Sequence, residues 1–166
     1  MANLLFVCTG NAARSVMAVT MMRSENTTHA VRGAGTFSIS GLPMSQRTRS
    51  ALASYELSDP DHRSKQLDRG DCDWADLIIV FEKEHIEYFK RHHPDSVTKT
   101  GSLPRISREL EAGEQSLRER ILKLNLESKS FEEWEEVTDP AGGDQEVFDS
   151  CADEIRVYVS QLALRI

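Results

Sequence analysis

The stretch LLFVCTGNAARSVMAV, residues 4–19, decides the fold class of this chain. Its first four residues are apolar and lead into a Gly-Asn turn, which is typical of a short buried strand and the loop that leaves it. From Arg14 onward, Val16, Met17 and Val19 supply the apolar surface of a helix. A buried strand that passes through a glycine-containing loop into a helix is typical of an α/β domain.

The same alternation continues along the chain. Further strands are predicted at residues 30–35 and 77–81 and, more weakly, near Val97; helices are predicted at 14–25, 44–57, 82–92, 115–127 and 145–164. The last helix has Asp144 as its predicted N-cap and an apolar stripe formed by Val147, Cys151, Ile155, Tyr158 and Leu162. We therefore expect one α/β domain over residues 1–166, with a parallel sheet and helices on both of its faces.

Composition limits the classes of function. A chain of 166 residues suits one buried core, and a net charge of −7 disfavours binding to nucleic acid. The N-terminus lacks the features of a signal peptide, and no apolar run is long enough to cross a membrane. Three cysteines without a CxxC pair indicate free thiols rather than a disulfide framework or a zinc site. We expect a cytoplasmic protein without a membrane partner, either a monomer or a weak dimer.

The loop after the first strand carries a set of residues suited to phosphoryl chemistry. Cys8 ends the strand, where ligands of α/β folds bind. A tight loop would turn its backbone amides inward at a helix N-terminus, which binds anions and favours a thiolate. Arg14 can hold two oxygens of a tetrahedral dianion with its planar fork, and Ser15 can hydrogen-bond the thiolate. Cys8 and Arg14 are the predicted catalytic residues; the predicted substrate-binding residues are Thr9, Gly10, Asn11, Ala12, Ala13 and Ser15.

The loop is not a nucleotide-binding loop of the Walker type, because it lacks Gly-Lys-Ser/Thr. A purely structural role remains open. In that case Cys8 would be a buried residue at the end of a strand, and Arg14 a neighbouring ion-paired side chain.

Phosphate transfer from an alcohol or phenol also needs a proton donor for the leaving group. Asp139 is the candidate, because Pro140 holds it extended and Ala141-Gly142-Gly143 provides a loop before the final helix. An ordinary Asp-Pro turn is the alternative for this segment.

These motifs together resemble the low molecular weight protein tyrosine phosphatases, in particular the bacterial members. VCTGNAARS is similar to the family's signature loop and Asp139-Pro140 to its general-acid loop, while residues 33–36, 62–67 and 74–78 resemble intervening segments. The resemblance implies a three-layer fold with a four-stranded parallel sheet. It also implies Cys8 as nucleophile, Arg14 as phosphate binder and Asp139 as acid and then base. The implied substrate is phosphotyrosine or a related aryl phosphomonoester, on a protein or a small molecule, without a metal or other cofactor.

The chain departs from the family pattern at two places. Ala13 stands where many members have a second cysteine that protects the nucleophile, so Cys8 is expected to be over-oxidised more easily. Ala141-Gly142-Gly143 replaces the tyrosines that often follow the acid, which weakens the case for phosphotyrosine. Phe37 or Ile39 could contact an aromatic substrate instead.

Two alternative functions remain open. An arsenate reductase of the same fold would need a small-molecule thiol, because Cys72 and Cys151 are expected to be core residues rather than relay thiols. A non-catalytic phosphate-binding module is the other alternative. His85, His92 and His93 are expected to be solvated, and the Glu-rich run at residues 131–136 is expected to be a solvated face with Phe131 and Trp134 packed inward.

Overall fold

The computed structural model describes residues 1–25 and 28–166 and contains one sheet of four parallel strands. The strands are β1 (Asn3–Cys8), β2 (Ala30–Gly35), β3 (Leu77–Val80) and β4 (Thr100–Ser102), in the order β2-β1-β3-β4. Leu4 of β1 pairs with Val31 on one side and with Leu77 on the other. The predicted α/β class with a four-stranded parallel sheet is confirmed.

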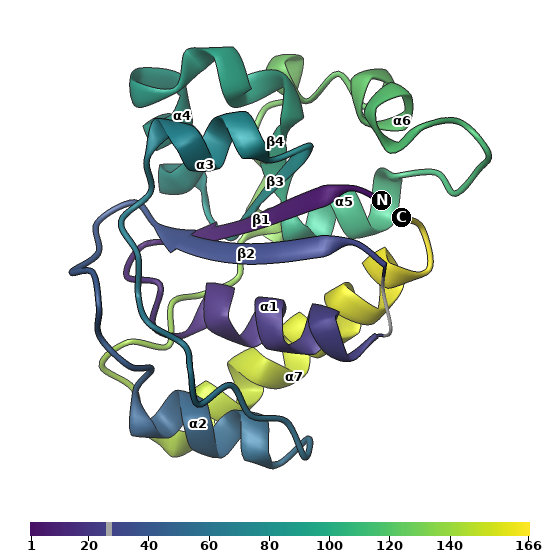
Figure 1. Ribbon diagram of the computed structural model, residues 1–166. Helices are drawn as coiled ribbons and strands as arrows, with labels where there is room; N and C mark the ends of the chain where they lie inside the picture. The colour runs from purple at the N-terminus through teal and green to yellow at the C-terminus, as the bar shows by residue number, and fades with distance from the viewer. Residues whose placement is uncertain (26–27) are drawn as a thin grey trace.

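Both faces of the sheet are buried, which explains why its central strands are apolar throughout. On one face, Leu4, Phe6 and Cys8 belong to a core that includes residues of α1 (Arg14–Ser24), α2 (Gln46–Ala53), α5 (Leu103–Glu109) and α7 (Gln145–Ala163). On the other face, Leu5 and Val7 pack with residues of α3 (Arg69–Trp74) and α4 (Lys83–His92). Figure 1 shows these helix layers on either side of the sheet.

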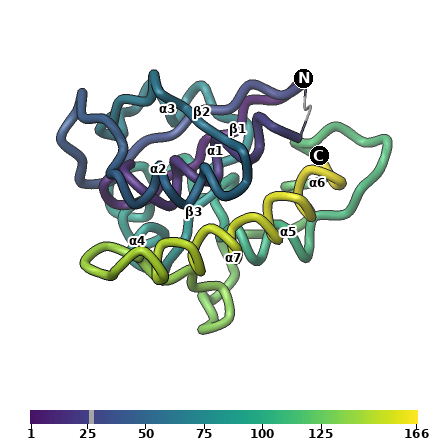
Figure 2. Tube along the Cα trace, turned by 90° about the horizontal axis from the view of Figure 1, so that it is seen from below, coloured from purple at the N-terminus to yellow at the C-terminus, as the bar shows by residue number. Residues whose placement is uncertain are grey.

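The long helix α7 spans the lower layer. It contacts α1, α2 and α5, and Figure 2 shows it from below, running along this face toward the C-terminus. The C-terminal end meets α6 (Leu117–Lys123), where Arg120 donates a hydrogen bond to the carbonyl of Arg165. No helix of the described residues is long and apolar enough to cross a membrane.

The carboxyl ends of all four parallel strands lie at one edge of the sheet. In Figure 1 the arrow of β1 points to this edge, and the segment that precedes α7 returns to it. The chain is fixed there by a hydrogen bond of 2.7 Å from the amide of Val137 to the carbonyl of Phe81, directly after β3. The loop after β1 and the segment around residue 139 are therefore neighbours.

Most predicted elements are confirmed, with small shifts at their ends. The strand predicted near Val97 is wrong: residues Pro94–Lys99 form the 3-10 helix η1, and β4 begins only at Thr100. Proline at the first position of a helical turn is pre-organised for that turn, which explains the outcome. The helix predicted at residues 44–57 spans only Gln46–Ala53, and Glu56 in the turn that follows adopts a left-handed conformation with φ of 58°.

The prediction that Val147 belongs to the buried stripe of the last helix is wrong. Val147 is 44% exposed, and the neighbouring Phe148 is buried instead. The other buried residues of α7 are Cys151, Ala152, Ile155, Val159 and Leu162, while Tyr158 is partly buried. Asp144 caps the helix as predicted, accepting a hydrogen bond from the amide of Val147 at 3.1 Å.

The Glu-rich run is not a solvated face throughout. Glu135, in the 3-10 helix η3 (Glu133–Glu135), is 2% exposed and accepts hydrogen bonds from Arg105 Nε and Nη2, both at 2.8 Å. Burial raises the pKa of Glu135, but hydrogen bonds from Arg105, Glu132 and Ser102 outweigh it and lower the pKa overall. A buried carboxylate with a paired guanidinium thus anchors the segment that leads to residue 139.

Candidate active site

Cys8 is the last residue of β1, and the loop from Thr9 to Ala13 joins it to α1. The sulfur lies 3.0 Å from Ser15 Oγ. Asn11 Nδ2 donates a hydrogen bond of 2.8 Å to the same hydroxyl oxygen. Because Ser15 Oγ accepts from Asn11, its own proton is free to point at the sulfur, where it would stabilise a thiolate.

Asn11 shapes the loop. Its φ of 50° places it in the left-handed region, which asparagine tolerates better than most residues. Its side-chain Oδ1 accepts from the amide of Lys65 at 3.0 Å, and its carbonyl oxygen accepts from His62 Nε2 at 2.9 Å. Burial lowers the pKa of His62. The segment around residues 62–65 therefore holds the loop from outside.

Gly35 at the end of β2 allows the loop to pass close by. A Cβ atom there would lie 2.5 Å from the carbonyl oxygen of Thr9 and 3.0 Å from the amide nitrogen of Asn11. The next residues hydrogen-bond to the loop directly: the amides of Thr36 and Phe37 donate to the carbonyls of Cys8 and Thr9, both at 2.9 Å. A side chain at position 35 would displace the backbone of the loop.

The loop offers backbone donors to an anion. Within the part of the chain that the structure describes, the amides of Gly10, Ala12 and Ala13 donate to no protein acceptor. The helix α1 begins directly after them, at Arg14, and no side chain caps it. Unpaired amides at the N-terminus of a helix are a favourable site for a phosphate or a similar oxyanion.

Arg14 is almost completely buried, with 1% of its surface exposed. Its Nη1 donates to Glu82 Oε2 at 2.5 Å and to the carbonyl of Val137 at 3.0 Å, and its Nη2 lies 3.3 Å from Asp139 Oδ2. Two carboxylates thus balance a charge that would otherwise be costly to bury. They also hold the guanidinium beside the loop that follows Cys8.

Asp139 lies at the rim of this site. Its side chain is 44% exposed, and its Oδ1 accepts from the amide of Ala141 at 3.0 Å while Oδ2 faces Arg14. Gly142, with φ of 82°, turns the chain back toward α7. The structure therefore brings the three predicted catalytic residues, Cys8, Arg14 and Asp139, to one edge of the sheet, with the six predicted loop residues beside them.

Two residues of the site were missed in the sequence. Glu82, directly after β3, pairs with Arg14, and no local pattern distinguishes it from the surrounding charged residues. His85, expected to be solvated, is 1% exposed. Its ring lies under the loop, with Nε2 3.0 Å from Thr9 Oγ1 and Nδ1 accepting from the amide of Phe81 at 3.2 Å.

The other two cysteines are buried, as expected. Burial raises the pKa of Cys72 to about 11 and that of Cys151 to about 12, so both are thiols at neutral pH. Cys72 lies in α3, just before the chain meets Asn3 at the opposite end of β1 from Cys8. Cys151 faces the acid loop, with its sulfur 3.9 Å from the carbonyl of Thr138.

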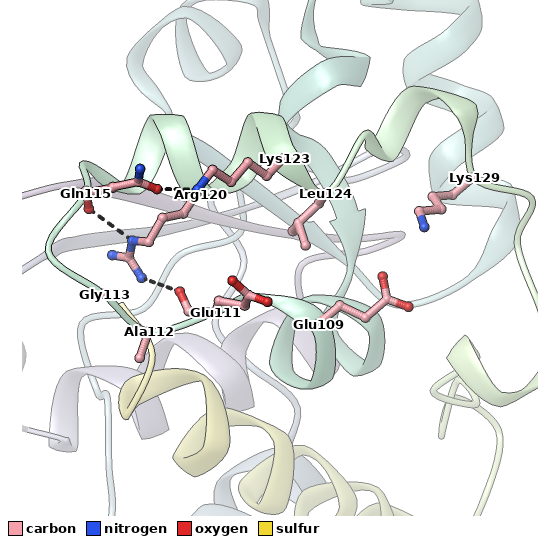
Figure 3. A pocket seen from close by; sticks show the side chains of 9 residues that line it. All are labelled: Glu109, Glu111, Ala112, Gly113, Gln115, Arg120, Lys123, Leu124 and Lys129. Carbon is pink, nitrogen blue, oxygen red and sulfur yellow. Dashed lines mark hydrogen bonds between the residues drawn. The ribbon is translucent and has the colours of Figure 1, made fainter.

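The structure offers other places where a ligand could sit. Figure 3 shows a cavity of about 490 Å³ between α5, α6 and the loop that joins them, lined by both acidic and basic side chains. None of the predicted site residues lines it. Among the described residues, no three His, Cys, Asp or Glu side chains form a group that could hold a metal ion.

Comparison with known proteins identifies a family and several relatives of this chain. The family model described as low molecular weight phosphotyrosine protein phosphatase matches residues 3–166. A protein-arginine-phosphatase of Geobacillus stearothermophilus is 26% identical over 164 residues, covering 98% of this chain and 95% of the relative. The probable low molecular weight protein-tyrosine-phosphatase EpsP of Ralstonia nicotianae is 32% identical, covering 62% of this chain and 69% of its own. The solved structure of the YwlE arginine phosphatase of G. stearothermophilus has a TM-score of 0.80 at 25% identity, covering 99% and 92% of the two chains.

Proposed function

Because the chain belongs to the low molecular weight phosphotyrosine protein phosphatase family, we propose that it hydrolyses phosphorylated proteins through a phosphocysteine intermediate on Cys8. One observation carries the proposal: Cys8, hydrogen-bonded to Ser15 and followed directly by a loop with unpaired amides, lies at the same edge of the sheet as buried Arg14 and its partner Asp139. A buried structural cysteine would need neither a loop of unpaired amides nor a carboxylate at the rim of the site.

The first step transfers the phosphoryl group to the enzyme. The Cys8 thiolate attacks phosphorus and forms an S–P bond, while the bond between phosphorus and the leaving group breaks. Asp139 in its acid form gives a proton to the leaving group. Arg14 and the loop amides stabilise the equatorial oxygens, whose negative charge is spread in the transition state.

The second step returns the enzyme to its starting state. Water attacks phosphorus, the S–P bond breaks, and inorganic phosphate leaves. Asp139, now a carboxylate, accepts the proton from water. Ser15 donates to the departing sulfur and stabilises it as a thiolate, consistent with its distance of 3.0 Å.

Phosphotyrosine is the first candidate substrate. The observation in its favour is an exposed apolar loop next to the site: Phe37 and Ile39 are 85% and 74% exposed, and the amide of Phe37 is bonded to the carbonyl of Thr9. An aromatic ring whose phosphate sits in the loop could pack on Phe37.

Phosphoarginine is the second candidate. A relative that covers nearly the whole chain is named a protein-arginine-phosphatase, and the residues after Asp139 are small rather than aromatic. The carboxylate of Asp139 lies at the rim of the cradle, where it would also suit a cationic guanidinium leaving group. In this case the bond that breaks is a P–N bond, with the same proton from Asp139.

The test is steady-state hydrolysis of para-nitrophenyl phosphate, a phosphotyrosine peptide and a phosphoarginine peptide under reducing conditions. Wild type and Cys8→Ser are compared, with Cys72→Ser as the matched cysteine control. We expect phosphate release that is lost in Cys8→Ser and retained in Cys72→Ser, and the preferred peptide identifies the substrate class. Hydrolysis that persists in Cys8→Ser would refute the nucleophile, whereas thiol-dependent arsenate reduction without phosphate release would favour the reductase.

A further inference from the structure

His85 lies beneath the loop and uses both of its ring nitrogens. The amide of Phe81 donates to Nδ1 at 3.2 Å, so Nδ1 is an acceptor and the proton must be on Nε2. Nε2 is 3.0 Å from Thr9 Oγ1, to which it therefore donates. The backbone at the end of β3 thus fixes the tautomer, and with it the direction of the hydrogen bond to Thr9.

This histidine is held neutral. Burial and the nearby charge of Arg14 lower the pKa of His85 to about 3. The carboxylate oxygen Glu82 Oε1 is 3.8 Å from Nε2, beyond hydrogen-bond distance, and is on the side chain that pairs with Arg14. A neutral ring can donate one hydrogen bond without placing a second buried positive charge next to Arg14.

Because the Thr9 hydroxyl oxygen accepts from His85, its own proton is not used in that hydrogen bond. Thr9 Oγ1 accepts from Nε2 and makes no other hydrogen bond among the described residues. The arrangement repeats that of Ser15, whose oxygen accepts from Asn11 so that its proton can serve Cys8. Thr9 directly follows the nucleophile and is only half-buried, so its proton is available to a group bound in the loop.

Resting on the phosphatase function proposed above, we propose that His85 is a positioning residue that orients the Thr9 hydroxyl as a further donor to the bound phosphoryl group. Residues at the start of α4 then contact both ends of the loop: Glu82 pairs with Arg14, and His85 donates a hydrogen bond to Thr9. His85 itself does not touch the substrate. Its contribution passes entirely through Thr9.

The test is a double-mutant cycle with Thr9→Val, His85→Leu and the combination, measured both as kcat/KM and as affinity for inorganic phosphate. Each single variant is expected to lower both quantities by about 10- to 100-fold, the order of losing one hydrogen bond to a charged group. The double variant should be no worse than Thr9→Val, because His85 acts through that hydroxyl. His92→Leu, an exposed histidine on the same helix, is the matched control and should change neither quantity.

Conservative replacements separate positioning from packing. Thr9→Ser and His85→Gln, which retain a hydroxyl and a donor of similar reach, should recover most of the phosphate affinity lost in the valine and leucine variants. Independent losses that multiply in the double variant would overturn the proposal, as would phosphate affinity unchanged by Thr9→Val. Thr9 is half-buried and lies outside the hydrophobic core, so Thr9→Val tests the donor role of the hydroxyl even if His85→Leu fails to fold. His85→Gln then tests the histidine.

Phosphate binding also distinguishes this inference from the proposed function. If wild type bound phosphate but hydrolysed no substrate, the function would fail, while weaker phosphate binding by Thr9→Val and His85→Leu would still support the donor role of Thr9.

Discussion

Arg14 carries a buried charge that two carboxylates balance before any substrate binds. Glu82 lies on the closed side of the site with 20% of its side chain exposed, whereas Asp139 lies on the open side. A phosphoryl group that enters the loop brings its own negative oxygens to the guanidinium. It can therefore replace the contact with Asp139 and free that carboxyl for proton transfer, while Glu82 continues to orient Arg14.

Glu82→Gln tests this division of roles. The variant keeps a hydrogen-bond acceptor but removes the charge that orients Arg14, and charge-assisted hydrogen bonds contribute about 1.5–3 kcal/mol. We expect kcat/KM to fall by about 10- to 100-fold in assays with para-nitrophenyl phosphate. Glu84→Gln, an exposed residue in the same helical turn, serves as the control; an equal effect of both variants would refute a specific role for Glu82.

Asp139→Asn removes the proposed proton donor and leaves a side chain of the same shape. General acid catalysis is worth about 10²–10⁴-fold, so kcat for a poor leaving group should fall by that order. The loss should shrink for aryl phosphates whose phenols are more acidic, because such phenols leave without a proton. A rate loss independent of leaving-group acidity would show that Asp139 acts in another way.

At the scale of elements, the site depends on how closely β2 approaches the loop after β1. Gly35 makes this approach possible, and the hydrogen bonds of Thr36 and Phe37 to the carbonyls of Cys8 and Thr9 maintain it. The shape of the cradle is therefore a property of two neighbouring strands and their exits, not of the loop alone.

Gly35→Ala is expected to disrupt the site. The added Cβ would overlap the carbonyl of Thr9, and overpacking of this kind costs about 1–3 kcal/mol of the free energy of unfolding. Phosphate affinity should fall as well, because the loop must move. Gly113→Ala is the control, since a Cβ there meets nothing within 4 Å; equal thermal stability of the two variants would contradict this role of Gly35.

The sequence predicts those elements whose structure is determined by residues close together in the chain. The apolar runs of β1 and β3, the Gly-Asn turn and the cap at Asp144 each follow from neighbouring residues, and so does the loop that carries Cys8 and Arg14. The roles of Glu82, His85 and Glu135 do not, because each is a polar residue in a polar stretch. Only the tertiary arrangement supplies their partners, such as Arg105 for Glu135, thirty positions away in the chain.

For the molecule as a whole, the histidines whose pKa is lowered in the folded state predict sensitivity to acid. The folded-state pKa of His85 is lowered from 6.5 to about 3, and those of His29, His62 and His93 are lowered as well, with burial as the largest cause in each. Below pH 6.5 the unfolded chain therefore binds more protons at these histidines than the folded chain does. Stability should fall as the pH drops through the window from about 6.5 to 3.

His85 makes the largest resolved contribution of the four, roughly 4–5 kcal/mol at the acid end of that window. We expect the free energy of unfolding, measured by urea denaturation between pH 7 and pH 4, to decrease steadily. His85→Gln should flatten the profile. A profile of wild type that is flat from pH 7 to pH 4 would contradict the burial of a neutral His85.

The measurement that tests the phosphocysteine intermediate most directly is rapid mixing of the enzyme with para-nitrophenyl phosphate, followed by acid quench and mass spectrometry of peptides. We predict a burst of nitrophenol of about one equivalent when the second step limits turnover. We also predict one phosphoryl group on the peptide that contains Cys8, absent in Cys8→Ser. A phosphoryl group on another residue, or turnover by wild type without a phosphoenzyme, would contradict the intermediate on Cys8.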